Sequence, residues 1–315
     1  MKIVYLDAYT VHPHEIDLGI FQKLGEYIQY DRTLPSQILE RAADAEILLT
    51  NKVVLDKGIL QQLPKLKYIG VTATGYNIID IAAANELGIT VTNAKNYSSN
   101  AVAQQVFAMI LSFANRLAEH SSFEKWASQP DFCYYDNSLT ELSGKTIGLV
   151  GFGNIAQKVA QIAHAFGMQV LVNKRTPLTS PILGIVEADL YTVLSTSDYI
   201  SLHCPLTAEN SGFMNSSAFA KMKNTAVLIN TARGGLINEA DLKVALNSGE
   251  IAGAYLDVLA VEPPAKDHIL AGVQNCKISP HIAWASVEAR RKLIEIVFEN
   301  LRSFLDGKPL NAINQ

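Results

Sequence analysis

Short apolar runs alternate with amphipathic stretches along most of this chain. In the N-terminal part, the pattern predicts strands at 3–6, 47–50, 68–72 and 90–92, with helices such as 35–43 and 79–87 between them. The same alternation returns after Thr176, with strands predicted at 199–202, 226–230 and 253–258 and a helix at 239–247. Strands that alternate with helices in this way are typical of parallel sheets in α/β proteins.

The stretch from Lys145 to Thr176 predicts a strand, a glycine turn, a helix and a second strand. An apolar run at 145–150 suits a buried parallel strand, and Gly151-Phe152-Gly153-Asn154-Ile155-Ala156 follows it directly. Gly151 permits a tight turn, Gly153 lets the backbone approach a pyrophosphate, and the small Ala156 allows close packing of helix and sheet. The free N–H groups of that helix would face phosphates, so the stretch predicts a site for NAD or NADP.

The apolar spacing of two helices predicts how they pack. Ile155, Val159, Ile162 and Phe166 recur as one buried helix face. A last helix at about 286–306 carries Ile294, Val297, Leu301 and Phe304 on one side, and that side needs a cover. We expect the C-terminus to return to the first domain, so that the chain crosses between two domains twice and encloses a cleft between them.

The predicted fold is therefore α/β, with two doubly wound parallel-sheet domains. Residues 99–285 would form a Rossmann cofactor domain, and residues 1–98 with 286–315 a flavodoxin-like substrate domain. Between the first sheet and the glycine turn, the pattern predicts one long helix at about 100–126 and then an aromatic loop at 129–137.

Composition narrows the class of protein. The 315 residues are 49% hydrophobic and 18% charged, as in a well-buried globular protein. A net charge of −4 offers no basic footprint for nucleic acid, so a small-molecule ligand is expected. The start of the chain lacks the features of a signal peptide, and the apolar stretch at 101–114 is too short to span a membrane.

Cysteine usage predicts a reducing compartment. Cys133, Cys204 and Cys276 are far apart and form no C-x-x-C motif, which suits reduced thiols in a cytoplasmic protein. None of the three is an obvious nucleophile, and the sequence implies no metal.

Three further segments carry the candidate chemistry, at 230–242, 256–264 and 279–286. In these segments, NTARGGLINEADL, LDVLAVEPP and SPHIAWAS, the chain resembles the D-isomer-specific 2-hydroxyacid dehydrogenase family. The resemblance extends to TATGYNIID at 72–80 and AVAQQVFAMIL at 101–111, and so covers nearly the whole length. TNK at 50–52, SQPDFCYY at 128–135 and HIAWAS look most like the glycerate dehydrogenase or hydroxypyruvate reductase branch.

The resemblance implies that Arg233, Glu262 and His281 are catalytic, and their chemistry fits the reduction of a 2-keto acid. A planar guanidinium at Arg233 can hold the substrate carboxylate through paired hydrogen bonds. The imidazole of His281 can donate a proton to the developing alkoxide. Glu262, hydrogen-bonded to the far ring nitrogen, would orient His281 and favour its charged form. Each residue also has an ordinary structural interpretation, as a surface ion pair, loop punctuation or a structural histidine.

Other site residues are expected on both domains. Lys52, Thr74, Gly75 and Trp284 are candidates for the substrate pocket, with a solvated lysine, an ordinary turn and core packing as the rival interpretations. Asp257 would hold the nicotinamide carboxamide, and its alternative is a cap. Further cofactor contacts are expected from the glycine turn and from the following residues: His203, Cys204, Pro205, Thr231, Ala232, Arg233, His281 and Ala283.

The end of the second cofactor strand departs from the NAD pattern. An acidic residue is expected there to bind the ribose hydroxyls of NAD. The chain instead reads Asn173-Lys174-Arg175-Thr176, with no carboxylate. Lys174, Arg175 and Thr176 could hold a 2′-phosphate, so NADPH is expected to be accepted at least as well as NADH. The simpler alternative is that Lys174 and Arg175 are solvated at the end of the strand and form no phosphate site.

Taken together, the sequence predicts a cytoplasmic oxidoreductase that reversibly reduces hydroxypyruvate to D-glycerate, and glyoxylate to glycolate, with NAD(P)H. Another D-2-hydroxyacid dehydrogenase, acting on phosphoglycerate or D-lactate, is the nearest alternative. Phosphoglycerate is less expected because no regulatory domain follows Gln315, and formate because Glu262 stands where that branch has a Gln. From a different class, a non-catalytic dinucleotide-sensing corepressor would keep this fold.

A homodimer built on the cofactor domain is also predicted, through the helix at about 100–126 and the aromatic loop. The aromatic loop carries Phe132, Tyr134 and Tyr135, and such residues contribute large buried areas at interfaces. The alternative is that the loop folds back on its own domain.

Overall fold

The computed structural model describes residues 1–11, 14–177 and 182–314. The chain forms two compact units, one of Met1–Ser98 with Trp284–Gln315 and one of Ser99–Ala283. The sequence therefore runs from the first unit into the second and returns, as the uncovered face of the last helix predicts. No helix among the described residues is long and apolar enough to cross a membrane.

The first unit is built on a parallel sheet of five strands in the order β2-β1-β3-β4-β5. This is the flavodoxin-like order, and it confirms the predicted fold of this unit. Its strands are β1 (Lys2–Tyr5), β2 (Glu26–Gln29), β3 (Ile47–Thr50), β4 (Tyr68–Val71) and β5 (Thr90–Asn93). Its helices are η1 (Ala8–Val11), η2 (Gly19–Lys23), η3 (Pro35–Gln37), α1 (Ile38–Ala42), α2 (Lys57–Leu60), α3 (Ile81–Glu86) and α10 (Val287–Leu305).

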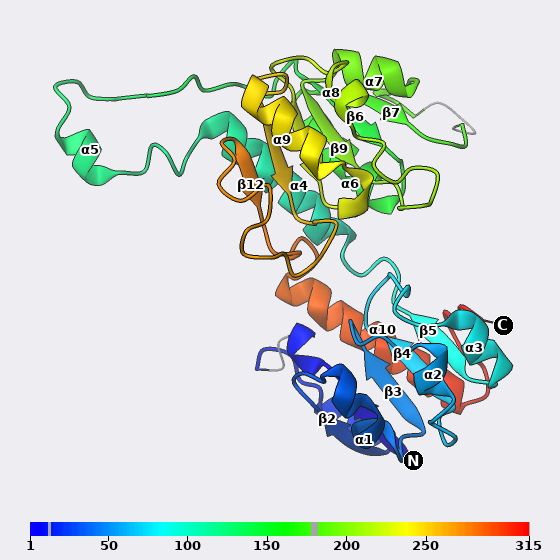
Figure 1. Ribbon diagram of the computed structural model, residues 1–315. Coiled ribbons are helices and arrows are strands. Elements are labelled where there is room, and N and C mark those ends of the chain that lie inside the picture. Colours follow the sequence, from blue (N-terminus) through cyan, green and yellow to red (C-terminus); the bar gives the residue numbers. More distant parts are fainter. Residues whose placement is uncertain (12–13, 178–181, 315) are drawn as a thin grey trace. The chain divides into compact units, whose positions relative to one another are not determined.

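Helices cover both faces of this sheet because alternate strand residues are apolar on both sides. Val4, Leu48 and Ile69 pack toward α1, α2 and α3. Tyr5, Leu49 and Tyr68 face the other way and pack against α10, whose buried residues include Leu293, Val297 and Leu301. Figure 1 shows α10 on one side of this sheet and α1 to α3 on the other. The predicted apolar face of the last helix is thus covered by the first unit.

The second unit has seven parallel strands in the order β12-β11-β10-β9-β6-β7-β8. Chain order reverses between β6 and β9, which is the Rossmann arrangement, so this prediction is confirmed. The strands are β6 (Thr146–Val150), β7 (Gln169–Asn173), β8 (Ile185–Glu187), β9 (Tyr199–Leu202), β10 (Val227–Asn230), β11 (Gly253–Leu256) and β12 (Cys276–Ile278). The helices are α4 (Ser99–Asn115), α5 (Phe123–Ala127), α6 (Asn154–Ala165), α7 (Leu190–Thr196), α8 (Ser216–Phe219), η4 (Gly234–Leu236) and α9 (Glu239–Ser248).

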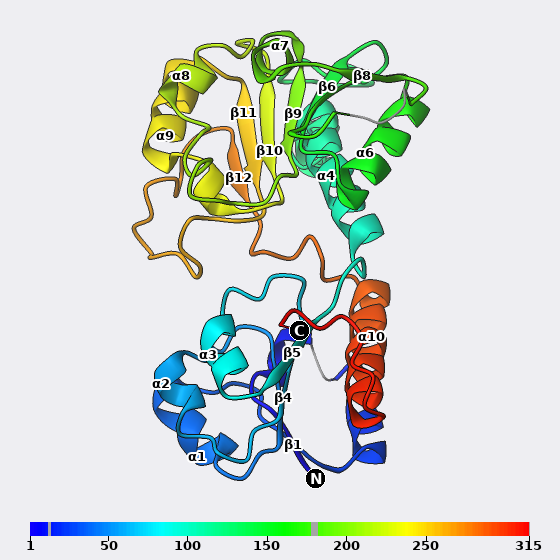
Figure 2. The same cartoon turned by 90° about the vertical axis from the view of Figure 1, so that its right-hand side faces the viewer.

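Two apolar layers enclose this second sheet. Ile200, Leu202 and Leu228 pack with the α7, α8 and α9 side. Val227 and Ile229 pack with the α4 and α6 side, where Ala103 and Val159 are fully buried. Figure 2 shows α8 and α9 on one face of the sheet and α4 and α6 on the other.

The segment after α4 differs from the prediction of one helix at 100–126. The helix ends at Asn115, and Arg116 has a left-handed φ of 47°, which a helix cannot continue through. A separate short helix, α5, begins at Phe123 after Ser122, whose side chain accepts the N–H of Lys125 at 3.2 Å. In Figure 1 the segment around α5 extends away from the sheet of its own unit. We call residues 116–141 the arm.

Two other expectations need correction. The strands β2, β8 and β12 are absent from the predicted pattern, because each is short and half-exposed and shows no continuous apolar run. Of the predicted face of α6, Val159 is buried, and Ile155 and Ile162 are half-buried against the same apolar cluster. The buried positions also include three alanines that were not predicted, Ala156, Ala160 and Ala163. Phe166, the last member of the predicted face, is 39% exposed and stacks on Phe107 of α4 at 5.4 Å.

Candidate active site

Glu262 and His281 form a direct hydrogen bond. His281 Nδ1 lies 2.6 Å from Glu262 Oε2, and both side chains are about one-third exposed. The second carboxylate oxygen, Oε1, accepts the backbone N–H of Leu259 at 2.9 Å. Because Glu262 is held from its own loop and binds Nδ1, the other ring nitrogen, Nε2, is left to serve as the proton donor.

Asp257 fixes the loop that carries His281. It follows β11, is 1% exposed, and its carboxylate accepts the Ser279 hydroxyl at 2.5 Å. The N–H groups of Ile282 and Ala283 donate to the same carboxylate at 3.0 and 2.8 Å. His281 itself donates its N–H to the Asp257 carbonyl at 2.8 Å.

This arrangement explains how His281 tolerates an unusual backbone. Its φ is 54°, in the left-handed region that side chains rarely adopt. The hydrogen bonds to Asp257 hold the residues on both sides of it and so maintain that conformation. Both Asp257 oxygens are therefore used inside the protein, and a contact of Asp257 with a nicotinamide stays a prediction.

Arg233 lies in the turn that follows β10. Asn230 shapes this turn, since its amide donates to the Arg233 carbonyl at 2.8 Å and its oxygen accepts the Ala232 N–H at 3.0 Å. The guanidinium is exposed and donates to the Ala232 carbonyl at 2.7 Å. Strands β10, β11 and β12 are parallel neighbours, so Arg233, Asp257 and His281 all follow carboxyl ends at one edge of the sheet, where ligands bind in such folds.

The glycine turn lies at the same edge, after β6. Gly151 has a φ of 93°, and a Cβ on it would lie 2.7 Å from the backbone nitrogen of Cys204. Only glycine fits this position, because both the conformation and the space exclude a side chain. Gly153 then precedes α6, whose first residues are Asn154 and Ile155, and the partly buried Phe152 and Ile155 pack against the apolar layer of α4 and α6.

Two observations test whether a dinucleotide fits here. A Cβ on Gly153 would meet no heavy atom within 4 Å among the described residues, so the space above this glycine is open. The hydroxyl of Thr231 is buried and finds no hydrogen-bond partner in the described part of the chain. An open helix start and an orphaned buried hydroxyl after β10 both suit a bound dinucleotide.

The corner after β9 forms the neighbouring wall. His203 Nε2 lies 2.9 Å from the Ser201 hydroxyl, and burial lowers the pKa of His203 to about 4. This imidazole is therefore neutral at physiological pH. Burial raises the pKa of the Cys204 thiol, and Pro205 follows it in an exposed position.

Burial likewise raises the pKa of Cys276 to about 11, and Cys133 is exposed on the arm. All three cysteines are free thiols. With the two half-buried thiols kept protonated, neither is suited to act as a nucleophile.

Lys174, Arg175 and Thr176 follow β7, the neighbour of β6. Lys174 is half-buried, and Arg175 and Thr176 are exposed. A hydrogen bond from Thr207 lowers the pKa of Glu209, and the positive charge of Arg175 adds to this effect. The end of β7 thus holds two cations, with the Glu209 carboxylate close enough to Arg175 to interact with it.

The predicted substrate residues of the first unit lie after β3 and β4. The buried Asp7 accepts the N–H groups of Asn51 at 2.8 Å and Lys52 at 2.6 Å, and so shapes the turn that carries Lys52. Burial raises the pKa of Asp7, while these N–H donors oppose the rise. Thr74 donates its hydroxyl to the Ala94 carbonyl at 2.8 Å and precedes the half-buried Gly75.

Trp284 opens the return segment of the first unit. It packs with the apolar cluster of α10, and its ring meets Tyr97 edge to face at 6.2 Å. These contacts fit the core-packing interpretation, and a role at the substrate stays a prediction.

Sequence reasoning missed several residues that hold the site, namely Asp7, Ser279 and Gly234. Asp7 is a lone acidic residue directly after an apolar strand, which is a signal that could have been used. Ser279 lies within the segment SPHIAWAS, but its bond to Asp257 spans a sequence separation that no local pattern reveals.

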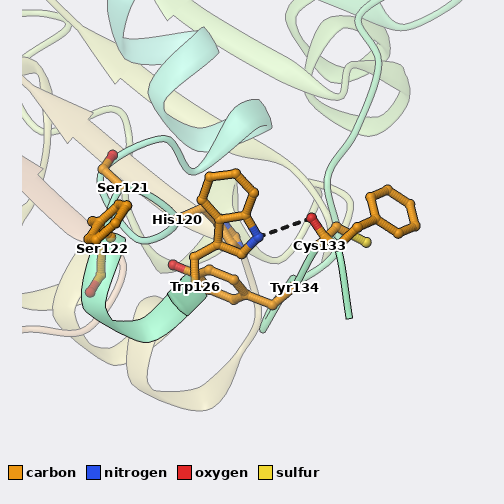
Figure 3. A pocket seen from close by; sticks show the side chains of 8 residues that line it. His120, Ser121, Ser122, Trp126, Cys133 and Tyr134 are labelled. Atoms are coloured by element: carbon orange, nitrogen blue, oxygen red, sulfur yellow. Dashed lines mark hydrogen bonds between the residues drawn. The ribbon is translucent and has the colours of Figure 1, made fainter. Parts of the chain in front are cut away.

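The arm carries a hollow of about 430 Å³. Figure 3 shows Trp126 among the side chains that line it. The indole Nε1–H of Trp126 donates to the Phe132 carbonyl at 3.0 Å. His120 accepts the Asp136 N–H on Nε2 at 3.1 Å and bonds the Arg116 carbonyl through Nδ1 at 3.0 Å. The arm is thus organised by its own contacts, yet Phe132 is 89% exposed and Tyr135 72% exposed.

The fold and glycine turn define an NAD(P)-binding oxidoreductase, and comparison with known proteins identifies the family. The model of the D-isomer specific 2-hydroxyacid dehydrogenase NAD binding domain matches residues 107–283. The chain belongs to this family, and is an NAD(P)-dependent 2-hydroxyacid dehydrogenase.

Similar proteins extend over the whole chain. The hydroxypyruvate reductase of Blautia hydrogenotrophica is 41% identical and covers 100% of both chains. The glycerate dehydrogenase of Methylorubrum extorquens is 39% identical, over 99% of this chain and 98% of its own. Among solved structures, an acyclic imino acid reductase in complex with NADPH and D-Arg superposes with a TM-score of 0.86 at 32% identity, over 99% of this chain and 100% of its own.

Proposed function

We propose that this dehydrogenase reversibly reduces hydroxypyruvate to D-glycerate, and glyoxylate to glycolate. The observation that carries the chemistry is the 2.6 Å contact between Glu262 and His281, which builds an oriented acid at the sheet edge where the cofactor domain binds its ligands. The choice of substrate rests on the full-length similarity to a hydroxypyruvate reductase and a glycerate dehydrogenase.

Arg233, Glu262 and His281 divide the work of the reaction. The Arg233 guanidinium binds the substrate carboxylate and orients the keto group. When bound, the reduced nicotinamide supplies the hydride that adds to the carbonyl carbon. The carbonyl oxygen then takes a proton from Nε2 of His281, so that a hydroxyl forms and the imidazole becomes neutral.

Glu262 makes His281 suitable for both directions. Its carboxylate binds Nδ1–H, which fixes the ring and stabilises the charged imidazole before the proton is given away. In the oxidation of D-glycerate, neutral His281 accepts the hydroxyl proton and Glu262 stabilises the charge that forms.

The cofactor would be held by the second unit and the substrate also by the first. The proposed cofactor contacts are the turn at Gly151–Ile155, the 203–205 corner, Thr231, Ala232, Asp257 and Ala283. The proposed substrate contacts of the unit formed by Met1–Ser98 and Trp284–Gln315 are Lys52, Thr74, Gly75 and Trp284. Backbone N–H groups of the loop after β4, which carries Thr74 and Gly75, are suited to bind a carboxylate oxygen of the substrate.

We further propose that NADPH is accepted at least as well as NADH. A carboxylate after β7 would bind ribose hydroxyls and repel a 2′-phosphate, whereas Lys174 and Arg175 place positive charge there. Similar proteins have been solved with either cofactor. The imino acid reductase is in complex with NADPH. A D-lactate dehydrogenase from Lactobacillus jensenii, 30% identical with a TM-score of 0.82 over 100% of both chains, is in complex with NAD⁺.

A homodimer is proposed as the working form, with the arm at the interface. Phe123, Phe132 and Tyr135 each expose more than two-thirds of their surface. Large aromatic residues in such numbers on one extended segment are typical of a surface that a partner covers.

The stereochemistry of product oxidation tests the proposed function. D-glycerate and L-glycerate are offered separately with NAD⁺ and with NADP⁺, and reduced cofactor is followed by absorbance. We expect turnover of D-glycerate alone. Equal use of both isomers, or oxidation of L-glycerate, would contradict the assignment.

A further inference from the structure

We propose that Glu239 and His268 are positioning residues, which hold the loop of Glu262 and through it the imidazole of His281. The proposal rests on the proposed function for the role of that imidazole. Glu239 is the first residue of α9, and His268 lies in the long loop between β11 and β12. Both side chains are 15% exposed, and neither belongs to the set of residues assigned above to substrate or cofactor.

Glu239 ties two distant points of this loop to one helix. Its Oε1 accepts the backbone N–H of Ala260 at 2.9 Å. Its Oε2 lies 3.2 Å from Nε2 of His268. Ala260 lies two residues before Glu262, so the first bond fixes the chain just ahead of the residue that binds His281.

The protonation of His268 follows from its second ring nitrogen. Nδ1 of His268 accepts the N–H of Leu270 at 3.3 Å, which requires Nδ1 to carry no hydrogen. Nε2 then carries the hydrogen and donates it to Glu239. The Glu239 carboxylate therefore accepts two N–H groups, and a half-buried carboxylate needs such donors.

The peptide that joins Leu259 to Ala260 is packed against the segment that carries Arg233. A Cβ on Gly234 would lie 1.9 Å from the carbonyl carbon of Leu259 and 2.3 Å from the nitrogen of Ala260. The backbone next to Arg233 is thus in direct contact with the Leu259–Ala260 peptide. Leu259 also donates its N–H to Glu262, at 2.9 Å.

These contacts link the two catalytic loops. The Leu259–Ala260 peptide touches Gly234 on one side, is bound by Glu239 through Ala260, and binds Glu262 through Leu259. A change of its position would move the Glu262 carboxylate relative to both Arg233 and His281. Since a displacement of about 1 Å in an active site can cost ~10²-fold in rate, the Glu239–His268 pair controls turnover without touching the substrate.

Three variants and a control test this in the whole enzyme. Glu239→Ala removes both bonds, His268→Ala removes one, and His268→Gln keeps a donor nitrogen in the place of Nε2. Lys243→Ala, on the exposed side of the same helix, is the matched control. We expect Glu239→Ala and His268→Ala to lower kcat for hydroxypyruvate by about tenfold or more, with KM for NADPH nearly unchanged. His268→Gln should recover most of the loss.

A spectroscopic readout separates positioning from stability and from substrate choice. The hydrogen-bonded Nδ1–H of His281 should give a low-field proton resonance, assigned by its loss in His281→Ala. We expect this resonance in the wild type, His268→Gln and Lys243→Ala, and its shift or loss in His268→Ala and Glu239→Ala. If Glu239→Ala does not fold, the two His268 variants decide the question.

The outcomes distinguish the two claims. A lower melting temperature in Glu239→Ala and His268→Ala, with kcat and the resonance unchanged, would overturn the positioning role. A wild type that turns over no 2-keto acid would defeat the proposed function, while the resonance would still test the positioning of His281.

Discussion

Nδ1 of His281 lies 2.6 Å from Oε2 of Glu262, although the two residues are separated by the whole of β12 and its flanking turns. Replacing Glu262 by Gln keeps an acceptor oxygen but removes the negative charge that stabilises charged His281. Reduction draws its proton from the charged form, so Glu262→Gln should lower kcat/KM for hydroxypyruvate severalfold. An unchanged kcat/KM in Glu262→Gln would show that this contact does not support the acid.

Loss of either side chain that handles the substrate should be more severe. We expect His281→Ala and Arg233→Ala each to reduce kcat/KM by at least ~100-fold, because acid catalysis and substrate orientation are each worth about this much. The loss at Glu262→Gln should be smaller. Arg302→Ala, which breaks an exposed ion pair with Glu299 on α10, is the control. Near-normal activity in a folded His281 or Arg233 variant would refute the assigned roles.

The cofactor preference can be tested at the end of β7. We expect kcat/KM with NADPH to be at least as high as with NADH. Lys174→Asp should shift the ratio toward NADH, because a carboxylate accepts the ribose hydroxyls and repels a 2′-phosphate. Lys158→Asp, on the exposed side of α6, supplies the same charge change away from the site. A wild-type preference for NADH of about tenfold, on the order of 1.4 kcal/mol, would count against a phosphate site.

The oligomeric state tests the role proposed for the arm. Light scattering at micromolar concentration should give the mass of a dimer. Phe132→Asp with Tyr135→Asp should give a monomer, since charges on this surface would oppose its burial. Val244→Asp, at an exposed position of α9, should leave the dimer intact. A monomeric wild type would show that the exposed aromatics serve another purpose.

His203 predicts how stability depends on pH. Burial lowers its pKa from 6.5 to about 4, so between these values the unfolded chain binds a proton that the folded protein does not. The free energy of unfolding should therefore fall as pH drops through this window, by about 3 kcal/mol at most from this group. In His203→Gln, denaturant titrations at a series of pH values should show a shallower fall. An identical slope would mean that His203 is not buried in its neutral form.

Much of the fold was predictable because its signals are local. The runs at 47–50 and 199–202 are continuous and apolar, and they form β3 and β9 with those bounds. The strand β12 was not predictable in this way, since Cys276 is half-buried, Lys277 and Ile278 are exposed, and the three show no apolar pattern. The long helix predicted at 100–126 failed at Arg116, where a left-handed residue gives no sequence signal of the kind that glycine gives.

In the candidate site, too, the features with a local sequence signal were predictable and those that depend on tertiary contacts were not. Arg233, Glu262 and His281 were recognisable because each lies in a motif after an apolar run. The contacts that hold them depend on residues far apart in the sequence, such as Ser279 with Asp257 and Glu239 with Ala260. Only the tertiary structure brings these pairs together, so neither spacing nor composition could indicate them.

A comparison of 2-keto acids under one set of conditions tests the proposed function most directly. Hydroxypyruvate, glyoxylate, pyruvate and phosphohydroxypyruvate are each offered with NADPH and with NADH, and kcat/KM is measured from the loss of absorbance. We predict that kcat/KM for hydroxypyruvate exceeds that for pyruvate and phosphohydroxypyruvate by about tenfold or more, as the full-length similarity to a hydroxypyruvate reductase and a glycerate dehydrogenase implies. A higher kcat/KM for pyruvate or phosphohydroxypyruvate, or no turnover of any of the four, would contradict it.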